Sequence, residues 1–137
     1  MKKAIVTGSN SEIGFAICEF LISYDYYVIA CFHNNHDRIE KLKSDNITMR
    51  KVDLTKESEI EALKKENADL IVNVAAYYFD DYLQEVKKND FMRTLEVNVV
   101  APLLLAKTIK KGKIISISST DAIDTYNELN ITYAASK

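Results

Sequence analysis

Proline, glycine and cysteine are scarce in this chain of 137 residues, which holds one proline, three glycines, two cysteines and no tryptophan. The composition therefore excludes collagen-like and Pro/Gly-rich low-complexity chains. Cys18 and Cys31 are too few for a disulfide framework, and both lie in apolar segments. We expect both to be reduced core residues, which is typical of a cytoplasmic protein.

Long hydrophobic runs and an excess of one charge are also missing. No apolar run approaches the roughly 20 residues of a membrane-spanning helix, and the N-terminal apolar stretch is too short for a signal peptide. The chain has 18 Lys and Arg against 20 Asp and Glu, which argues against a nucleic-acid or anionic-membrane partner. Because 47% of the residues are hydrophobic, we expect one folded domain over residues 1–137.

Short apolar segments alternate with segments of helical period along the whole chain. We expect strands at residues 3–7, 27–32, 47–52, 70–74 and 113–118. We expect helices at residues 11–23, 36–43, 55–65 and 90–110 and from residue 131, with loops at residues 77–89 and 119–130. Strands without charge that alternate with helices predict an α/β fold, a doubly wound parallel sheet of Rossmann type. We predict strand order 3-2-1-4-5, residues 47–52 at one edge, and ligands at the carboxyl ends of strands one and four.

Three details of the helices are predicted from single residues. Thr55 is expected to cap the helix that follows it, and Gly112 to end the helix at residues 90–110 in a left-handed conformation. Pro102 has no N–H to donate to the carbonyl of Asn98 four residues earlier. The first helix is expected to bury one apolar face, made of Ile13, Ala16, Ile17, Phe20 and Leu21.

A loop of small residues joins the first strand to the first helix, with the sequence TGSNSEIG at residues 7–14. Small residues allow the backbone to approach a phosphate, and the following helix offers free N–H groups and a positive dipole end. A tight strand–helix turn, in which the glycines only allow close packing, is the alternative.

The loop resembles the T-G-x-x-x-G-x-G cofactor loop of the short-chain dehydrogenase/reductase family. Glu12 stands where that family has its middle glycine. We expect the Glu12 carboxylate to point outward, which leaves room for an anionic cofactor. The resemblance implies a cofactor-binding loop made of Gly8, Ser9, Asn10, Ser11, Ile13 and Gly14.

The resemblance extends over the whole chain. Asp53 and Leu54 match the family's adenine-contacting position, although an aspartate at a strand–helix turn would serve equally well as a local cap. Asn73, Val74, Ala75 and Ala76 resemble in part the family's N-N-A-G motif, which implies that Asn73 and Ala75 lie at the cofactor. The aromatic residues Tyr77, Tyr78, Phe79 and Tyr82 either line the mouth of the site or cover the core.

The catalytic residues follow from the same resemblance. Residues 133–137, YAASK, carry the Y-x-x-x-K signature, which puts Tyr133 and Lys137 on one helix face. The family pattern implies that Tyr133 is the acid/base, that Lys137 lowers its pKa and contacts the nicotinamide ribose, and that Ser119 holds the substrate oxygen. Thr120 takes the place of Ser119 if the loop is one residue shorter. The backbone oxygen of Asn98 is implied to hold a water of the proton relay.

The end of the second strand bears on the choice of cofactor. An NAD site would place an acidic residue there, on the ribose hydroxyls. Residues 31–36 carry no acid, whereas His33 and Arg38 are close by, so we predict NADP as the preferred cofactor, with NAD as the alternative. We interpret His33 and His36 as solvated loop residues and expect no metal site.

The last residue is Lys137, whereas the family continues well past this lysine. We therefore expect a domain incomplete at its C-terminus that keeps the nucleotide-binding half, exposes the edge of its fifth strand and lacks competent catalysis. The alternatives are a fragment of a longer enzyme, a non-catalytic dinucleotide-binding or partner-subunit module, and a receiver-type signalling domain phosphorylated on Asp53. The family resemblance implies a small carbonyl or alcohol substrate and a homo-oligomer paired through the helix at residues 90–110.

Overall fold

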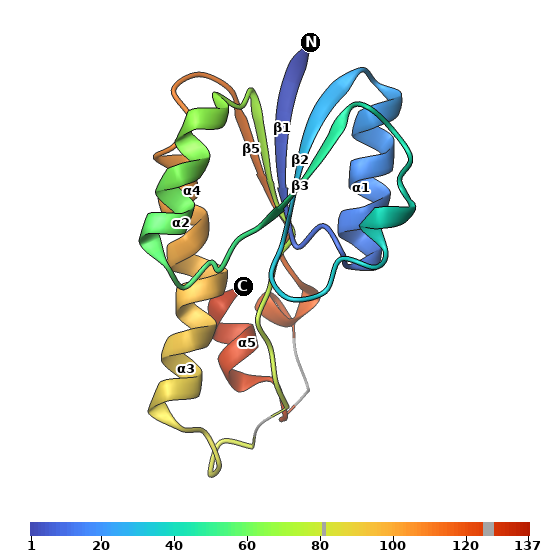
Figure 1. Cartoon of the computed structure of the whole chain (residues 1–137). Helices are drawn as coiled ribbons and strands as arrows, with labels where there is room; N and C mark the ends of the chain where they lie inside the picture. The colour runs from blue at the N-terminus through green and yellow to red at the C-terminus, as the bar shows by residue number, and fades with distance from the viewer. Residues whose placement is uncertain (81, 125–127) are drawn as a thin grey trace.

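Five parallel strands form one sheet in the order β3-β2-β1-β4-β5 (Figure 1), which confirms the predicted topology. The computed structural model describes residues 1–80, 82–124 and 128–137. The strands are β1 Lys2–Thr7, β2 Tyr26–Phe32, β3 Ile47–Lys51, β4 Leu70–Asn73 and β5 Lys113–Ser116. As predicted, β3 lies at one edge, and within the described residues β5 forms the other edge.

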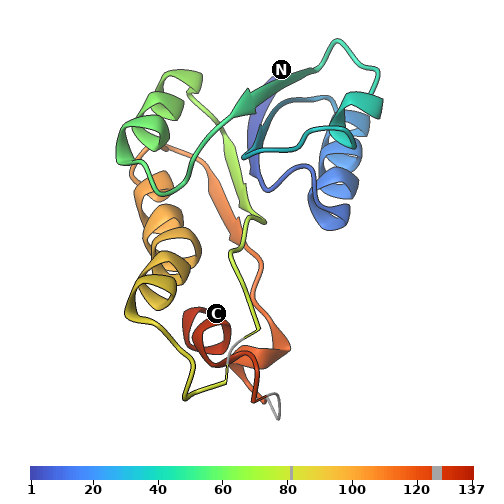
Figure 2. The same cartoon turned by 60° about the horizontal axis from the view of Figure 1, so that its bottom comes forward.

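Helices cover both faces of the sheet. They are α1 Glu12–Ser23, α2 Glu57–Ala62, α3 Lys88–Leu95, α4 Ala101–Ala106 and α5 Ile131–Ser136, with short 3₁₀ turns at Ile39–Lys41, Leu63–Glu66 and Thr120–Ala122. Figure 1 places α1 on one side of the sheet and α2 and α4 on the other, while Figure 2 shows α3 and α5 side by side beyond the carboxyl ends of the strands.

Alternate residues of each strand feed two separate cores because successive side chains point to opposite faces. Ala4 and Val6 of β1 belong to the core under α1, which also holds Cys18. Ile5 of β1 belongs to the core on the other face, which also holds Cys31. Both thiols are free and buried, and burial raises the pKa of each to about 12, so neither is reactive at neutral pH.

The predicted inner face of α1 was wrong in three of its five members. Gly14, Cys18 and Leu21 are the buried residues of α1, whereas Ile13 and Phe20 are more than half exposed and Ala16 is exposed as well. The reason is geometric: the two sets lie about a quarter turn apart on the helix, and the smaller residues allow the helix to sit close to the glycine loop.

Two other local predictions were also wrong. The segment expected as a helix at residues 36–43 holds only the 3₁₀ turn Ile39–Lys41. The N-cap of α2 is Lys56, without a side-chain hydrogen bond, instead of Thr55. The hydroxyl and the N–H of Thr55 both donate to Oδ1 of Asp53. The local turn is therefore held by Asp53, the residue type that most readily bonds the backbone two positions on.

The long helix expected at residues 90–110 is interrupted and shorter. Its middle, Glu96–Val100, is π-helical, and the N–H of Ala101 donates to the carbonyl of Glu96, five residues earlier. This irregularity lies directly before Pro102, which supplies no N–H to the helix. Gly112 is not a left-handed cap, because Gly8 is the only described glycine with positive φ. Gly112 instead allows a close approach, since a Cβ there would lie 2.3 Å from the carbonyl oxygen of Asp69.

Residues 77–87 form the predicted loop, apart from residue 81, which like residues 125–127 of the later loop lies outside the described residues. The helix before the interruption begins at Lys88. Among the residues that the structure describes, no helix has both the length and the apolar composition that crossing a membrane requires.

Candidate cofactor cleft and active site

The loop between β1 and α1 is built around two glycines. Gly8 has φ +62°, and a Cβ there would lie 2.7 Å from the backbone nitrogen of Ala75. A Cβ on Gly14 would lie 2.2 Å from the carbonyl oxygen of Gly8. Only glycine fits at both positions, because the neighbouring backbone is so close. Without these side chains the loop can pack against the end of β4.

Serine and asparagine side chains fix the loop from within. Ser11 caps α1, since its Oγ accepts the N–H of Gly14 at 3.0 Å and donates to the carbonyl of Gly8 at 2.8 Å. Ser9 is fully buried, and its N–H and hydroxyl both donate to the carbonyl of Cys31 at the end of β2. The loop is thus held in one conformation before any ligand arrives.

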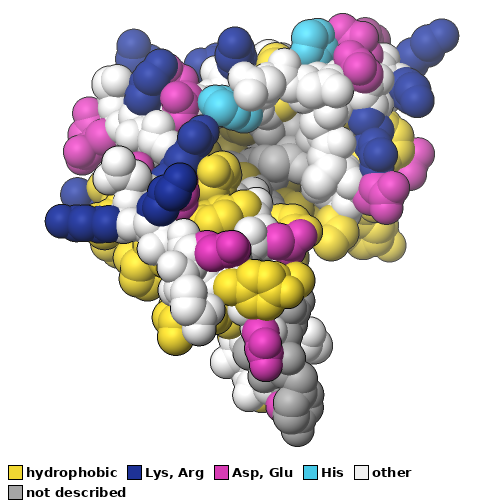
Figure 3. Space-filling model, turned by 90° about the horizontal axis from the view of Figure 1, so that it is seen from below, with side chains coloured by type: hydrophobic (Ala, Val, Ile, Leu, Met, Phe, Trp, Pro, Cys, Tyr) yellow, Lys and Arg dark blue, Asp and Glu magenta, His cyan; other side chains and the backbone are white. Residues whose placement is uncertain are grey.

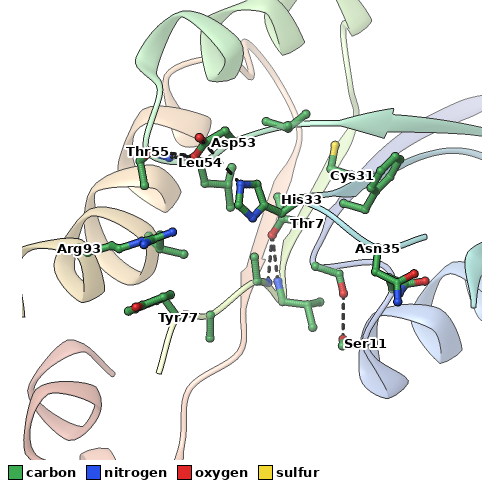
Figure 4. Close-up of a pocket in the computed structure, with 18 residues that line it drawn as sticks. Thr7, Ser11, Cys31, His33, Asn35, Asp53, Leu54, Thr55, Tyr77 and Arg93 are labelled. Atoms are coloured by element: carbon green, nitrogen blue, oxygen red, sulfur yellow. Dashed lines mark hydrogen bonds and ion pairs between the residues drawn. The ribbon is translucent and has the colours of Figure 1, made fainter. Parts of the chain in front are cut away.

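A cleft of about 260 Å³ opens at the carboxyl ends of the strands, where the sequence analysis expected a ligand. Figure 3 views the molecule from this end and shows the hollow among hydrophobic side chains, and Figure 4 shows the residues around it. Of the predicted cofactor-binding residues, the cleft is lined by Gly8, Asn10, Ser11, His33, Asp53, Leu54 and Ala75. Thr7 joins the two central strands beneath it, because its Oγ1 accepts the N–H groups of Val74 and Ala75, both at 3.2 Å.

Other predicted cofactor residues stand behind or beside the cleft. Asn73 is buried and its amide donates to Oγ of Ser116 at 3.0 Å, which ties β4 to β5. Ser9 and Gly14 shape the loop from behind. Ile13 is exposed, and Arg38 is not part of the cleft lining, although its N–H donates to Oδ1 of Asn10, which is.

Asp53 marks one end of the cleft. Hydrogen bonds from the Thr55 hydroxyl and N–H hold the pKa of the Asp53 carboxyl below its usual value, and the nearby His33 and Lys56 side chains add to this lowering. His33 Nε2 lies 3.9 Å from the second carboxylate oxygen, Oδ2. Asp53 is therefore an ionised hydrogen-bond acceptor at neutral pH. Its Oδ2 can accept a hydrogen bond from a ligand.

Tyr77 and Arg93 form the wall opposite the glycine loop. The guanidinium carbon of Arg93 lies 4.7 Å from the centroid of the Tyr77 ring, and both side chains line the cleft. In Figure 4 both lie on the left of the cleft, below Asp53 and Leu54, and Ser11 and Asn35 lie on the right. The guanidinium over the ring therefore places a positive charge in this wall of the cleft. Arg93 was missed because a lone arginine on an amphipathic helix looks like a solvated residue in the sequence.

Asn98 joins the loop after β4 to the last helix. Its Oδ1 accepts the N–H of Tyr77 at 2.7 Å, and its Nδ2 donates to the carbonyl of Tyr77 at 2.9 Å and to Oγ of Ser136 at 2.8 Å. Ser136 in turn donates to the carbonyl of Tyr133 at 2.7 Å. The Asn98 side chain thus connects the cleft wall to the helix that carries Tyr133.

Tyr133 of α5 and Lys137, which directly follows α5, lie close together, with the Lys137 ammonium 5.5 Å from the centroid of the Tyr133 ring. Lys137 Nζ donates to the carbonyl of Ile117 at 2.7 Å, and burial lowers the pKa of its ammonium group. The Tyr133 ring also contacts Tyr78 edge-on, with centroids 5.7 Å apart. A cation and an aromatic ring therefore border the Tyr133 side chain.

Ser119 begins the short turn Thr120–Ala122, where its Oγ accepts the N–H of Asp121 at 3.2 Å. No hydrogen bond joins Ser119 to Tyr133 among the residues that the structure describes. The structure thus brings Asn98, Tyr133 and Lys137 together through α5 but leaves Ser119 engaged with its own turn.

Glu12, the departure from the loop pattern, points away from the cleft as expected. Its side chain is 88% exposed, and its Oε1 lies 3.5 Å from Nη1 of Arg38. The cleft lining does not include Glu12, so the anionic side chain leaves the glycine loop open.

Known proteins resemble the chain over nearly its whole length. The family model described as short chain dehydrogenase matches residues 2–137. A 3-oxoacyl-[acyl-carrier-protein] reductase of Rickettsia prowazekii is 33% identical, in an alignment that covers 99% of this chain and 61% of the reductase. An NADPH-dependent 3-dehydrocapnine reductase of Ornithobacterium rhinotracheale is 28% identical, over 100% of this chain and 56% of that protein.

Among solved structures, a 4-hydroxyisoleucine dehydrogenase complexed with NADH matches with a TM-score of 0.87 and 26% identity, over 99% of this chain and 62% of that one. The chain therefore spans about three-fifths of the length of the proteins it matches.

Proposed function

Because the chain belongs to the short-chain dehydrogenase/reductase family, we propose that it binds a nicotinamide dinucleotide over the carboxyl ends of β1 and β4, as the nucleotide-binding half of an oxidoreductase that transfers hydride to or from a small carbonyl or alcohol substrate. The observation that carries the proposal is the cleft between the rigid Gly8–Gly14 loop and the Asp53 turn. Family membership also removes the receiver-type alternative for Asp53.

The residues present fit such a cofactor. Gly8 and Ser11 offer a loop without bulky side chains at the N-terminus of α1, where a pyrophosphate is favoured by free N–H groups and the helix dipole. Asp53 and Leu54 would hold the adenine at the other end of the cleft, which Arg93 also lines. Relatives with NADPH and with NADH in their names both support a nicotinamide cofactor, and the absence of an acid at residues 31–36 supports a preference for NADP.

The bound nicotinamide would supply the hydride, and the chain would supply the proton. Tyr133 would donate or accept that proton, and a free tyrosine, with a pKa near 10, needs help to do so at neutral pH. The Lys137 ammonium lies beside the Tyr133 ring, in the position that the family's Y-x-x-x-K signature gives to its lysine. Asn98 would keep Tyr133 and Lys137 in place through Ser136, and Ser119 would hold the substrate oxygen.

We also propose that the protein is cytoplasmic and forms a homo-oligomer. The two buried free thiols support a reducing compartment. One continuous helix is formed by α3, the π-helical segment Glu96–Val100 and α4. It leaves apolar side chains exposed, namely Met92, Val99, Val100 and Leu103. Exposed apolar residues on one helix favour pairing with a second copy.

Titration of the purified chain with NADPH and NADH, followed by the cofactor's fluorescence, tests the proposal. We expect saturable binding of both. Arg93→Met should weaken both dinucleotides about two- to fivefold, because a cation over an aromatic ring at an exposed position contributes about 0.5–1 kcal/mol, and should leave binding of nicotinamide mononucleotide unchanged. Arg50→Met, which removes an arginine paired with Glu66 outside this cleft, is the control. If neither dinucleotide binds at millimolar concentration, the proposed function is refuted.

A further inference from the structure

An ion pair that the family's loop pattern does not provide lies beside Asn10, which lines the cleft. Glu12 replaces the middle glycine and is the first residue of α1. Arg38 lies just before the 3₁₀ turn Ile39–Lys41, on the segment that leaves β2. Their charged atoms Oε1 and Nη1 are 3.5 Å apart, so the first turn of α1 and the segment after β2 are linked by opposite charges.

Two backbone hydrogen bonds hold the segment that carries Arg38 beside the cleft. The N–H of Arg38 donates to Oδ1 of Asn10 at 2.9 Å, and the N–H of Ile39 donates to the same oxygen at 3.2 Å. Asn10 itself lines the cleft, as do His33 and Asn35 from the end of β2. The backbone of Arg38 is therefore fixed beside the cleft, and only the side chain can move to another ion-pair partner.

Two anions compete for that guanidinium group. One is the Glu12 carboxylate, which is present in the free protein. The other is the 2′-phosphate of NADPH, which carries a charge of about −1.5 to −2 at neutral pH and which NADH lacks. Arg38 is 39% exposed in the pair, so its side chain has room to turn toward a phosphate. When it does, the Glu12 carboxylate loses its partner and remains near a second negative charge.

We propose that Glu12 is a positioning residue that acts through Arg38 to reduce the preference for a 2′-phosphorylated dinucleotide. The proposal rests on the proposed function, since it requires dinucleotide binding in this cleft. Glu12 holds Arg38 away from the 2′-phosphate and repels that phosphate, whereas NADH gives Arg38 no new partner. The chain therefore accepts both cofactors more evenly than it would with an uncharged residue at this position.

The test compares dissociation constants for NADPH and NADH in Glu12→Gln, Arg38→Gln and the double variant at low ionic strength, where surface charges are least screened. Because exposed ion pairs contribute little, Glu12→Gln should raise the affinity ratio for NADPH over NADH about three- to fivefold. Arg38→Gln should lower the ratio, and Glu12→Gln should then leave it unchanged. Glu19→Gln removes the same charge from the exposed face of α1 and should not alter the ratio.

Each other outcome overturns the proposal. If Glu12→Gln strengthens both cofactors equally, Glu12 acts on the shared pyrophosphate and not on the 2′-phosphate. If the ratio falls in Glu12→Gln, the pair prepares Arg38 for the phosphate, which is the opposite role. If the affinity ratio does not fall in Arg38→Gln, Glu12 does not act through Arg38. If the unchanged chain binds neither dinucleotide, the proposed function fails together with this inference, whereas binding with an unaltered ratio refutes the inference alone.

Discussion

Replacing Gly14 with alanine is expected to weaken dinucleotide binding about tenfold to a hundredfold, because overpacking costs about 1–3 kcal/mol. The added Cβ would lie 2.2 Å from the carbonyl oxygen of Gly8 and 2.8 Å from Cα of Ser9. Both are backbone atoms, so α1 and the loop must move apart. Alanine in place of glycine also favours a helix by about 1 kcal/mol, but the contact with backbone outweighs this gain.

Dissociation constants for NADPH and the free energy of urea unfolding measure the two parts of this effect. Glu19→Ala, at an exposed position of the same helix, is the control and should change neither quantity by more than about 0.5 kcal/mol. A Gly14→Ala chain that is more stable than the parent and binds NADPH equally well would show that the close approach of α1 to the loop is not required.

Replacing Asn98 with alanine is expected to release α5 from the cleft wall. The change removes three hydrogen bonds and leaves both backbone groups of Tyr77 without the side chain that pairs them. At about 1 kcal/mol for each net hydrogen bond, the local stability of α5 and of the Tyr77 loop should fall by about 2–3 kcal/mol.

Amide hydrogen exchange in Ile131–Ser136 measures this loss, because it reports the free energy of local opening. Asn98→Asp keeps the acceptor for Tyr77 and removes both donated bonds, so it should give an intermediate effect. Asn89→Ala, on the exposed side of α3, should leave exchange unchanged. Equal protection of α5 in Asn98→Ala and the parent would show that α5 is held by other contacts.

Strand order and the position of the cleft were predictable because they follow from strong local patterns. The strands around Ile5, Ile29 and Ile71 carry short uncharged runs between segments of helical period, and such runs have few arrangements other than a parallel sheet. The carboxyl ends of β1 and β4 then mark the crevice where the strand order reverses. The glycine loop pointed to the same place independently.

The inner face of α1 was not predictable in the same way. The helix carries two stripes, one with Ile13 and Phe20 and one with Gly14 and Cys18. Hydropathy favours the first stripe, since its side chains are larger. The sheet takes the second because a small residue is needed where the helix crosses the loop, and that constraint arises only once both elements are placed in space.

Asn98 and Arg93 illustrate what remained hidden at the site. The sequence marked Asn98 for its backbone carbonyl, whereas the structure shows its side chain bridging residues 21 and 38 positions away. Arg93 reaches the cleft because the helix that bears it passes beside Tyr77. Contacts between residues so far apart in the chain depend on tertiary packing, which no local pattern encodes.

Backbone amide NMR spectra during an NADPH titration test the central claim most directly. We predict that chemical-shift changes concentrate at Gly8–Gly14, around Asp53 and Leu54, and at Tyr77 and Arg93, and that Gly14→Ala reduces them. Changes scattered over surface lysines, or changes confined to the far end of the sheet around Tyr26 and Lys113, would contradict a dinucleotide site at the glycine loop.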